Sequence, residues 1–274
     1  MTSQTARSAV SQPQALLRER VRELAILTLN RPESRNSLSE GLIAALDAAL
    51  REIRDDTAVR AVVIAATSNA FSAGHDMKEL IARRGDADQG RAYFAEIMTR
   101  CSTMMQAIVN LPKPVIAAVQ GIATAAGCQL VASCDLAVAS EAASFATPGV
   151  DIGLFCSTPM VALSRNIPRK HAMEMLLTGE PISATTARDL GLVNRVVPAG
   201  SERDEAIALA ERIARKSAYT IKIGKAAFYR QAEMSLSDAY RYAAEVMTEN
   251  MMARDAEEGI GAFIEKREPK WQDK

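Results

Sequence analysis

Two short loops combine very small residues with side chains that could take part in chemistry. One loop reads FSAGHD, residues 71–76, and the other reads GIATAAGCQ, residues 121–129. Each follows an apolar, strand-like run and precedes a helical pattern. A strand that leads into a helix presents unpaired backbone N–H groups at the helix N-terminus, and small residues let a ligand oxygen approach them closely.

Two such N–H groups, one from each loop, would form an oxyanion hole for the carbonyl oxygen of a thioester. The same small residues would also suit tight packing of a helix against a strand. Spacing alone favours neither interpretation.

Charge and cysteine content exclude several classes of function. Lys and Arg together number 33, as do Asp and Glu, so no overall field attracts nucleic acid or a membrane surface, and we expect neither partner. The four cysteines form no CxxC pair and have no histidine at ligand spacing, so we expect buried free thiols and no bound metal. No apolar run reaches the roughly 18 residues of a membrane span.

The first 13 residues are polar and free of acidic side chains. We expect a disordered N-terminal tail and a cytoplasmic protein, with a transit peptide and the mitochondrial matrix as the alternative.

Apolar runs and amphipathic stretches alternate along the rest of the chain. Residues 24–29, 59–67, 114–119 and 135–140 are predicted as strands, and residues 91–112 as a long helix. Ser37 and Glu40 form a capping-box pattern before a second helix, whose apolar face would be Leu42, Ile43, Leu46, Leu50 and Ile53. This alternation predicts an α/β fold with a parallel sheet over residues 14–200 and a helical appendage over residues 201–274.

Five segments carry a resemblance to a known family. They are LAILTLNRPESRNSLS (24–39), FSAGHDMKEL (71–80), residues 113–154 from KPVIAAV to DIGL, TGEPISATTARDLGLVNRVVP (178–198) and EGIGAFIEKR (258–267). Through these segments the chain resembles the enoyl-CoA hydratase/isomerase (crotonase) superfamily over residues 14–270.

The resemblance implies the crotonase (ClpP-like) fold, a spiral of ββα units with a C-terminal helical trimerisation region. It also implies a homotrimer or a hexamer built as a dimer of trimers, and a place in fatty acid metabolism. The substrate would be an acyl-CoA thioester and the enzyme a lyase or isomerase. No cofactor would be bound permanently, since coenzyme A arrives as part of the substrate.

Residue roles follow from the matching positions. The oxyanion N–H groups would belong to His75 and Ala126, where Ala replaces the common Gly and is tolerable if its φ stays negative. The groove for coenzyme A would be lined by the residues of two loops and by two C-terminal positions, sometimes from a neighbouring subunit: Arg35, Asn36, Ser37, Leu38, Asp76, Met77, Lys78, Phe263 and Lys266.

The chain departs from the family at the two catalytic glutamates, which in hydratases share one water for proton transfer. Gln129 and Gly149 stand at these positions, and neither can act as an acid or base. A glutamate at 149 would be strained if that residue holds φ > 0. Asp151 could enter the same pocket if its segment is a strand, because residues i and i+2 of a strand share a face.

Two other functions therefore remain open. One is an acyl-CoA decarboxylase-like enzyme, since relatives with that activity also carry SAGHD. They use a tyrosine where this chain has Cys156, however. The other is a non-catalytic acyl-CoA-binding scaffold. The His75 side chain would act in catalysis or be held by a backbone hydrogen bond.

Overall fold

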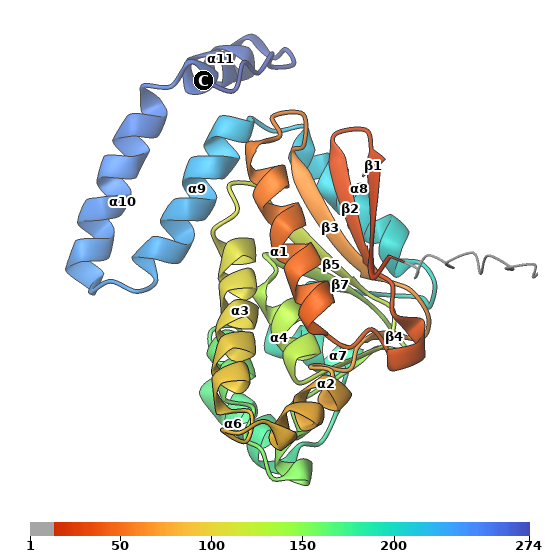
Figure 1. Cartoon of the computed structure of the whole chain (residues 1–274). Coiled ribbons are helices and arrows are strands. Elements are labelled where there is room, and N and C mark those ends of the chain that lie inside the picture. The colour runs from red at the N-terminus through yellow and green to blue at the C-terminus, as the bar shows by residue number, and fades with distance from the viewer. Residues whose placement is uncertain (1–13) are drawn as a thin grey trace, which may run out of the picture.

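The structure, a computed structural model, describes residues 14–274 and contains two sheets (Figure 1). The predicted tail, residues 1–13, lies outside the described residues. The main sheet has the order β1-β2-β3-β5-β7-β10. Its strands are Leu16–Val21, Leu24–Leu29, Ala61–Ala66, Val115–Val119, Leu136–Ser140 and Arg195–Val197. Within this sheet, as described for residues 14–274, only β1 and β2 pair antiparallel, which confirms the predicted parallel sheet.

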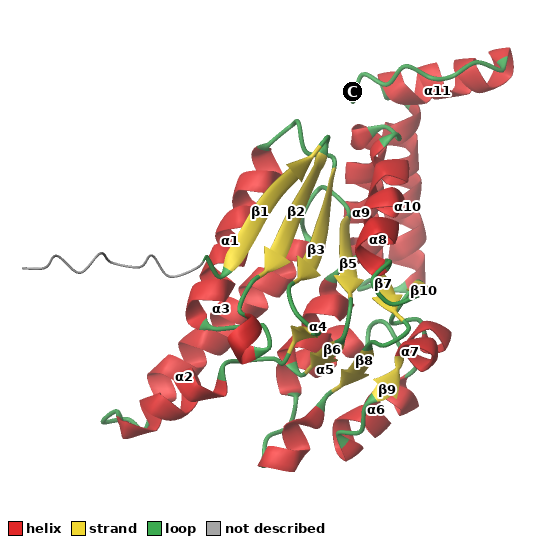
Figure 2. Cartoon of the chain, turned by 90° about the vertical axis from the view of Figure 1, so that its right-hand side faces the viewer, coloured by secondary structure: helices red, strands yellow, loops and turns green. Residues whose placement is uncertain are grey.

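A second sheet of short strands has the order β4-β6-β8-β9. These strands are Ala70–Ser72, Ile122–Thr124, Ser144–Ala146 and Ile182–Ser183. Each of β3, β5 and β7 continues into a short strand of this second sheet and then into a helix, which repeats a ββα unit along the chain (Figure 2). Residue pattern did not predict β4, β6 and β9, because two or three residues are too few to show a period of two.

Helices cover both faces of the main sheet. The seven that precede residue 200 are α1 Glu40–Asp55, α2 Met77–Ala82, α3 Arg91–Val109, α4 Ala126–Ser133, α5 Ser157–Leu163, α6 Arg169–Thr178 and α7 Ala184–Leu190. Short 3-10 helices span Pro32–Ser34, Arg83–Gly85 and Pro148–Ile152. Alternate residues of a strand face opposite sides. Val62 and Ile64 of β3 accordingly pack in the cluster with α1 and α3, while Val63 packs in the cluster with α8, Glu202–Ala214.

α1 begins two residues later than the predicted capping box. All five predicted core residues of this helix are buried. The N-cap, however, is Ser39, whose hydroxyl accepts from the Leu42 N–H, so the capping-box assignment to Ser37 is wrong. Ser37 instead donates its hydroxyl hydrogen to the Asp76 carboxylate at 3.1 Å.

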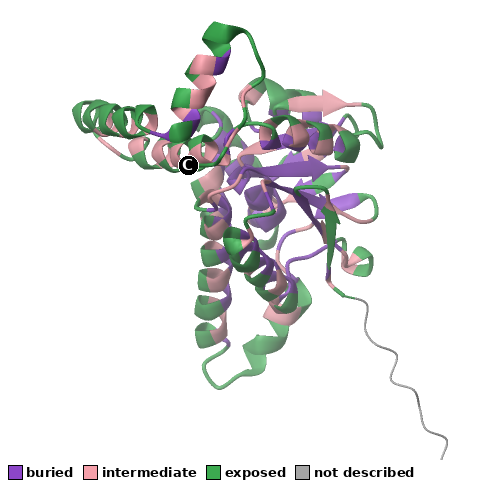
Figure 3. Ribbon diagram, turned by 90° about the horizontal axis from the view of Figure 1, so that it is seen from above, coloured by how far each residue is buried: buried purple, intermediate pink, exposed green. Residues whose placement is uncertain are grey.

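Ala206, Ala210 and Ala214 of α8 are buried against the main sheet, so this first helix of the predicted appendage packs on the core. The appendage proper, which we call the C-terminal arm, comprises residues 218–274 with α9 Ala218–Gln231, α10 Leu236–Met251 and α11 Arg254–Glu265. Its helices α10 and α11 stand away from the body of the molecule (Figure 1), and much of the surface of the arm is exposed (Figure 3).

A buried ion pair anchors the arm to the core. The Lys225 ammonium on α9 lies 2.6 Å from the Asp135 carboxylate, and only 8% of the lysine side chain and 15% of the aspartate side chain are exposed. Lys225 also donates to the carbonyls of Ile108 and Lys113, and the Tyr229 hydroxyl donates to Asp135. Burial raises the pKa of Asp135 and lowers that of Lys225, and their mutual attraction opposes both shifts. Each partner is therefore needed to keep the other ionised.

Removing the lysine should leave an uncompensated buried carboxylate. We expect Lys225→Met to lower the free energy of unfolding by about 3–5 kcal/mol, measured by urea denaturation. Lys222→Met, on an exposed position of the same helix, is the matched control and should stay within about 0.5 kcal/mol of wild type. Equal, small effects of both changes would show that the pair does not hold the arm.

Candidate active site

The carboxyl ends of β4, β6 and β8 meet at one place. These neighbouring parallel strands end at Ser72, Thr124 and Ala146. The Ala125 N–H donates to the Ala146 carbonyl at 2.9 Å, which joins the loops after β6 and β8. The loop after β4 reaches the same point, because a Cβ built on Gly74 would lie 3.0 Å from the Ala125 Cβ and 3.3 Å from the Ala126 nitrogen.

The backbone of His75 is turned toward this meeting point. The Leu38 N–H donates to the Gly74 carbonyl, and the Leu38 carbonyl accepts from the Asp76 N–H, which forms an isolated parallel bridge. In a parallel bridge the two hydrogen bonds use the carbonyl before the bridging residue and the N–H after it, here those of Gly74 and Asp76. The N–H of the bridging residue, His75, therefore points to the opposite side of its chain segment. The His75 N–H is thus directed away from Leu38.

The N–H of Ala126 is free for another reason. Ala126 is the first residue of α4, and the first N–H groups of a helix have no partner within it. Its neighbour Gly127 lies so close to β4 that a Cβ there would collide with the Ser72 carbonyl oxygen. Small residues in this loop therefore serve packing and also bring the Ala126 nitrogen beside Gly74.

Ala125 holds a backbone conformation that favours glycine. Its φ is +50° and its ψ −118°, whereas Ala126 is helical. The ψ of Ala125 sets the plane of the peptide that carries the Ala126 N–H, so the strained residue orients that group. Strain of this kind persists only where the surrounding structure imposes it, and it gathers at functional sites.

Three neutral side chains around the meeting point have buried polar atoms without a hydrogen-bond partner in residues 14–274. The atoms are Nδ1 and Nε2 of His75, Oε1 of Gln129 and Oγ1 of Thr147. Burial lowers the pKa of His75, and the Leu38 carbonyl beside the ring opposes this shift. Burial therefore favours the neutral imidazole.

Gly149 leaves no space for the missing acid. The φ of Gly149 lies outside the left-handed region, so the backbone strain that a positive φ would cause for a glutamate there does not arise. The obstacle is contact: a Cβ there would lie 2.8 Å from the Leu154 carbonyl oxygen and 2.9 Å from the Cys156 sulfur. Burial raises the pKa of Cys156, and all four cysteines are buried and free, as predicted.

Asp151 does not share a face with Gly149. Its segment is the 3-10 helix Pro148–Ile152 and not a strand, so the rule for residues i and i+2 does not apply. A Cβ on Gly179, at the end of α6, would lie 3.1 Å from the Asp151 carboxylate. The side chain is exposed and turned toward α6.

Several residues predicted to line the coenzyme A groove hold the loops together by buried contacts. The Asp76 carboxylate caps α2, lies 3.0 Å from the Arg31 guanidinium and accepts from Ser37. Burial raises the pKa of Asp76, but the bonds from Arg31, Ser37 and the Glu79 backbone more than offset this and leave it below its usual range. Asn36 is fully buried and donates to the Thr67 and Ala70 carbonyls, and Leu38 is 1% exposed.

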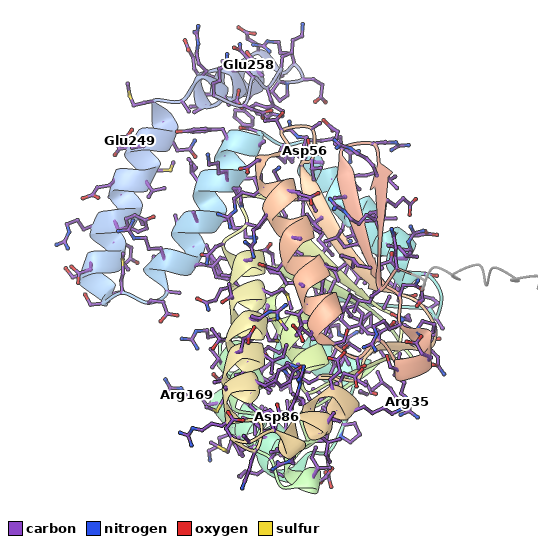
Figure 4. All side chains as sticks on the ribbon, viewed as in Figure 1. Arg35, Asp56, Asp86, Arg169, Glu249 and Glu258 are labelled. Atoms are coloured by element: carbon purple, nitrogen blue, oxygen red, sulfur yellow. The ribbon has the colours of Figure 1, made fainter. Side chains whose placement is uncertain are left out.

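The remaining groove residues have exposed side chains. Arg35, Met77 and Lys78 lie on the outside, and Arg35 is labelled in Figure 4. The Arg35 carbonyl accepts from the Ala73 N–H, which places this residue directly beside the loop that carries His75. Phe263 and Lys266 are exposed on α11, at the opposite end of the molecule from α2 (Figure 1). Within one chain they cannot reach the same groove.

Sequence reasoning missed Thr147 and Ala125. Thr147 carries a fully buried hydroxyl at the end of β8, but in the sequence it is one threonine before a proline. The conformation of Ala125 depends on the approach of Gly74, 51 positions earlier by residue number, and no local signal encodes that.

This fold and this pair of converging loops define a class of proteins. A family model described as enoyl-CoA hydratase/isomerase matches residues 19–274, so the chain belongs to the enoyl-CoA hydratase/isomerase (crotonase) family. It is 49% identical to the Xenopus laevis protein named "Enoyl-CoA hydratase domain-containing protein 3, mitochondrial", over 89% of this chain and 82% of that protein. The human protein of the same name is 48% identical over 89% of this chain and 79% of its own length.

Solved structures agree with this assignment. The crystal structure of an enoyl-CoA hydratase from Mycobacterium smegmatis superposes with a TM-score of 0.89 at 52% identity, covering 95% of this chain and 99% of that one. Human enoyl Coenzyme A hydratase domain-containing protein 3 superposes with a TM-score of 0.89 at 46% identity, covering 94% and 100%. The expected crotonase fold is thereby confirmed.

The strain at Ala125 is open to a direct test. We expect Ala125→Gly to raise the free energy of unfolding by about 1 kcal/mol, because glycine adopts φ > 0 without steric cost. Ala123→Gly, in the neighbouring strand β6 with ordinary φ, is the control and should lower it by about 0.5–1 kcal/mol. Thermal unfolding at fixed protein concentration measures both. A loss of stability in both variants would mean that Ala125 carries no strain.

Proposed function

We propose that this protein binds an acyl-CoA thioester and polarises its carbonyl between the backbone N–H groups of His75 and Ala126. The observation that carries the proposal is the convergence of the two loops, with the His75 N–H turned away from Leu38 and the Ala126 nitrogen beside Gly74. Preorganised donors of this kind stabilise a developing oxyanion, and removing one costs on the order of 3 kcal/mol in other enzymes. Coenzyme A would enter as part of the substrate, with no permanently bound cofactor.

Ordinary hydration is poorly supported by the side chains around these donors. An amide at Gln129 has no useful pKa, and Gly149 has no side chain. The contacts of Gly149 with Leu154 and Cys156 support the view that the pocket is shaped without an acid there. Enolate-stabilising lyase or isomerase chemistry needs the oxyanion donors more than it needs the glutamate pair.

A non-catalytic acyl-CoA-binding scaffold is the second candidate. The lack of an acid at positions 129 and 149, which disfavours hydration, favours such a scaffold. Gln129 and Thr147 are neutral, and Asp151 is turned toward α6. Decarboxylase-like chemistry has less support. The thiol of Cys156, whose pKa burial raises, stands where a tyrosine would be expected.

The exposed cations Arg35 and Lys78 suit the phosphates of coenzyme A. Phe263 and Lys266 could complete the groove only from a neighbouring subunit. No helix within residues 14–274 is long and apolar enough to cross a membrane. The vertebrate relatives compared above carry "mitochondrial" in their names, which supports a mitochondrial location of this chain over a cytoplasmic one.

Thioester binding is the first test of the proposal. Titration calorimetry should detect binding of butyryl-CoA, with an affinity that falls as salt is raised because the phosphates meet exposed cations. Hydration of crotonyl-CoA should be far slower than with an ordinary hydratase assayed in parallel. An absence of binding to any acyl-CoA would remove the proposal, and a hydration rate near that of the reference enzyme would show that the acids have been misplaced.

The C-terminal arm supports assembly into a trimer or hexamer. Large apolar side chains on α10, on α11 and between them are widely exposed, namely Leu236, Tyr240, Met247, Met252, Phe263 and Ile264. A lone chain would leave this surface in water, which favours its burial against another copy.

Light scattering should therefore give a mass of three or six chains at micromolar concentration. Met247→Glu should weaken the assembly, because it places a charge on the apolar surface of α10. Glu249→Gln on the same helix, labelled in Figure 4, is the control and should not. A stable wild-type monomer would contradict the proposed assembly.

A further inference from the structure

The position of α11 is not explained by apolar packing. Within residues 14–274 this helix buries only Asp255 and Ala262. Its apolar side chains Phe263 and Ile264 are 85% and 72% exposed. Most helices of a folded protein are held by an apolar face that packs on the core. Since α11 lacks that support in its own chain, other contacts fix where it lies.

A segment that follows α11 folds back along it. Lys266 has φ +55°, a left-handed conformation that ends the helix and reverses the chain. We call residues 267–274, after this turn, the clasp. The Glu258 carboxylate on α11, labelled in Figure 4, accepts from the Arg267 guanidinium at 2.6 and 3.0 Å and from the Lys270 N–H at 2.7 Å. These bonds attach the first part of the clasp to the helix.

The second part of the clasp is bound to the beginning of α11. The Asp255 carboxylate, on a residue that is 2% exposed, accepts from the N–H groups of Gln272 and Asp273 at 2.7 and 3.0 Å. The Trp271 ring packs on the helix at Gly259, where a Cβ would lie 3.1 Å from the ring. The clasp and α11 therefore form one unit.

Asp273 connects this unit to the core. Its carboxylate accepts from both terminal nitrogens of the Arg60 guanidinium, at 2.7 and 3.1 Å, and from the Ala218 N–H at 2.7 Å. The Arg60 side chain is 14% exposed and also donates to the carbonyls of Ala214 and Lys216, at the end of α8 and just beyond it. A guanidinium that binds a carboxylate through two parallel bonds fixes its orientation as well as its position.

Two further observations describe the connection. The Trp271 indole N–H donates to the Arg215 carbonyl at 2.9 Å, which is a second contact between the clasp and the segment after α8. The bonds from Arg60 hold the pKa of Asp273 below its usual range, although burial opposes them. The carboxylate is therefore ionised at neutral pH, and the pair with Arg60 stays closed.

The unit of clasp and helix carries two residues that were expected at the coenzyme A groove. Phe263 and Lys266 lie at the opposite end of the molecule from α2, so they could reach a groove only in a neighbouring subunit (Figure 1). An ammonium group at Lys266 suits the phosphates of coenzyme A. Such a contact is stronger when the cation is held in place before the ligand arrives, because ordering it on binding lowers the affinity.

We propose that the clasp fixes α11 to the core of its own chain through Asp273 and Arg60, and thereby positions Lys266 for the phosphates of an acyl-CoA bound to a neighbouring subunit. Asp273 is a positioning residue, which touches no substrate itself. This inference rests on the proposed function, since it requires acyl-CoA binding and assembly with a neighbouring subunit.

The state of the clasp can be measured directly, because Trp271 is the only tryptophan of the chain. We expect Asp273→Asn to free the clasp, which moves the Trp271 emission to longer wavelength and increases its quenching by acrylamide. Glu268→Gln is the matched control, since it removes the same charge from an exposed side chain of the clasp and should leave the fluorescence unchanged. Unchanged fluorescence in Asp273→Asn would refute the clasp.

Two thioesters that differ in their phosphates test the positioning. Butyryl-pantetheine has the acyl group and the pantetheine of butyryl-CoA but no phosphate and no nucleotide. In calorimetric titrations, Asp273→Asn should weaken binding of butyryl-CoA about fivefold or more and leave that of butyryl-pantetheine unchanged. Equal losses for both thioesters, or no loss for either, would overturn the positioning while the proposed function stands. If wild type binds no acyl-CoA, both fail.

A cycle of variants assigns the loss to Lys266. Lys266→Gln should weaken binding of butyryl-CoA by a similar factor while the Trp271 fluorescence stays that of wild type. The variant that combines Asp273→Asn with Lys266→Gln should bind no more weakly than Lys266→Gln alone, because both changes remove the same contact. Losses that multiply would show that the clasp acts through a different contact, and the positioning of Lys266 would be refuted.

Discussion

The site depends on one steric constraint, the direct contact between the backbone after β4 and the backbone after β6. The Ser72 carbonyl oxygen occupies the position that a Cβ of residue 127 would need, and Gly74 approaches Ala125 and Ala126 almost as closely. Only residues without a side chain, or with a methyl group, allow two strands to lead into helices at this separation. The contact brings the loops that carry the N–H groups of His75 and Ala126, which have no backbone partner within residues 14–274, together without any polar side chain.

The same contact explains the strain and the polar features around it. Ala125 takes φ +50° because the chain must turn from β6 into α4 while it passes Gly74. On the outer side, the loop with His75 is held by the Leu38 bridge and by Asp76, whose carboxylate caps α2 and pairs with Arg31. Residues that resemble ligand contacts in the sequence, such as Asn36 and Ser37, prove to brace this loop by buried hydrogen bonds.

Much of the architecture could be predicted from the sequence, and the limits have physical causes. Apolar runs of five or six residues predicted β2, β3, β5 and β7, because a strand buried on both faces must be apolar throughout. The short strands of the second sheet lack such a signal. Resemblance located His75, Ala126, Gln129 and Gly149 in the chain, but the contacts that exclude a side chain at Gly149 come from Leu154 and Cys156 across a turn. Thr147 became a candidate only because the structure shows its hydroxyl buried without a partner in residues 14–274.

The absence of carboxylates at the matched positions changes what the site can do electrostatically. Backbone donors polarise a carbonyl whatever the ionisation of nearby side chains, so Gln129 in place of an acid leaves that capacity intact. A carboxylate at position 129 would be costly to bury without a group that compensates its charge. A buried amide or hydroxyl loses only its hydrogen bonds with water. With His75 held neutral by burial, the three segments around the strand ends present donors and acceptors but no titrating pair. On the proposed function, chemistry at a bound thioester would therefore draw on stabilisation of the enolate oxygen by the backbone donors and not on a protein acid or base.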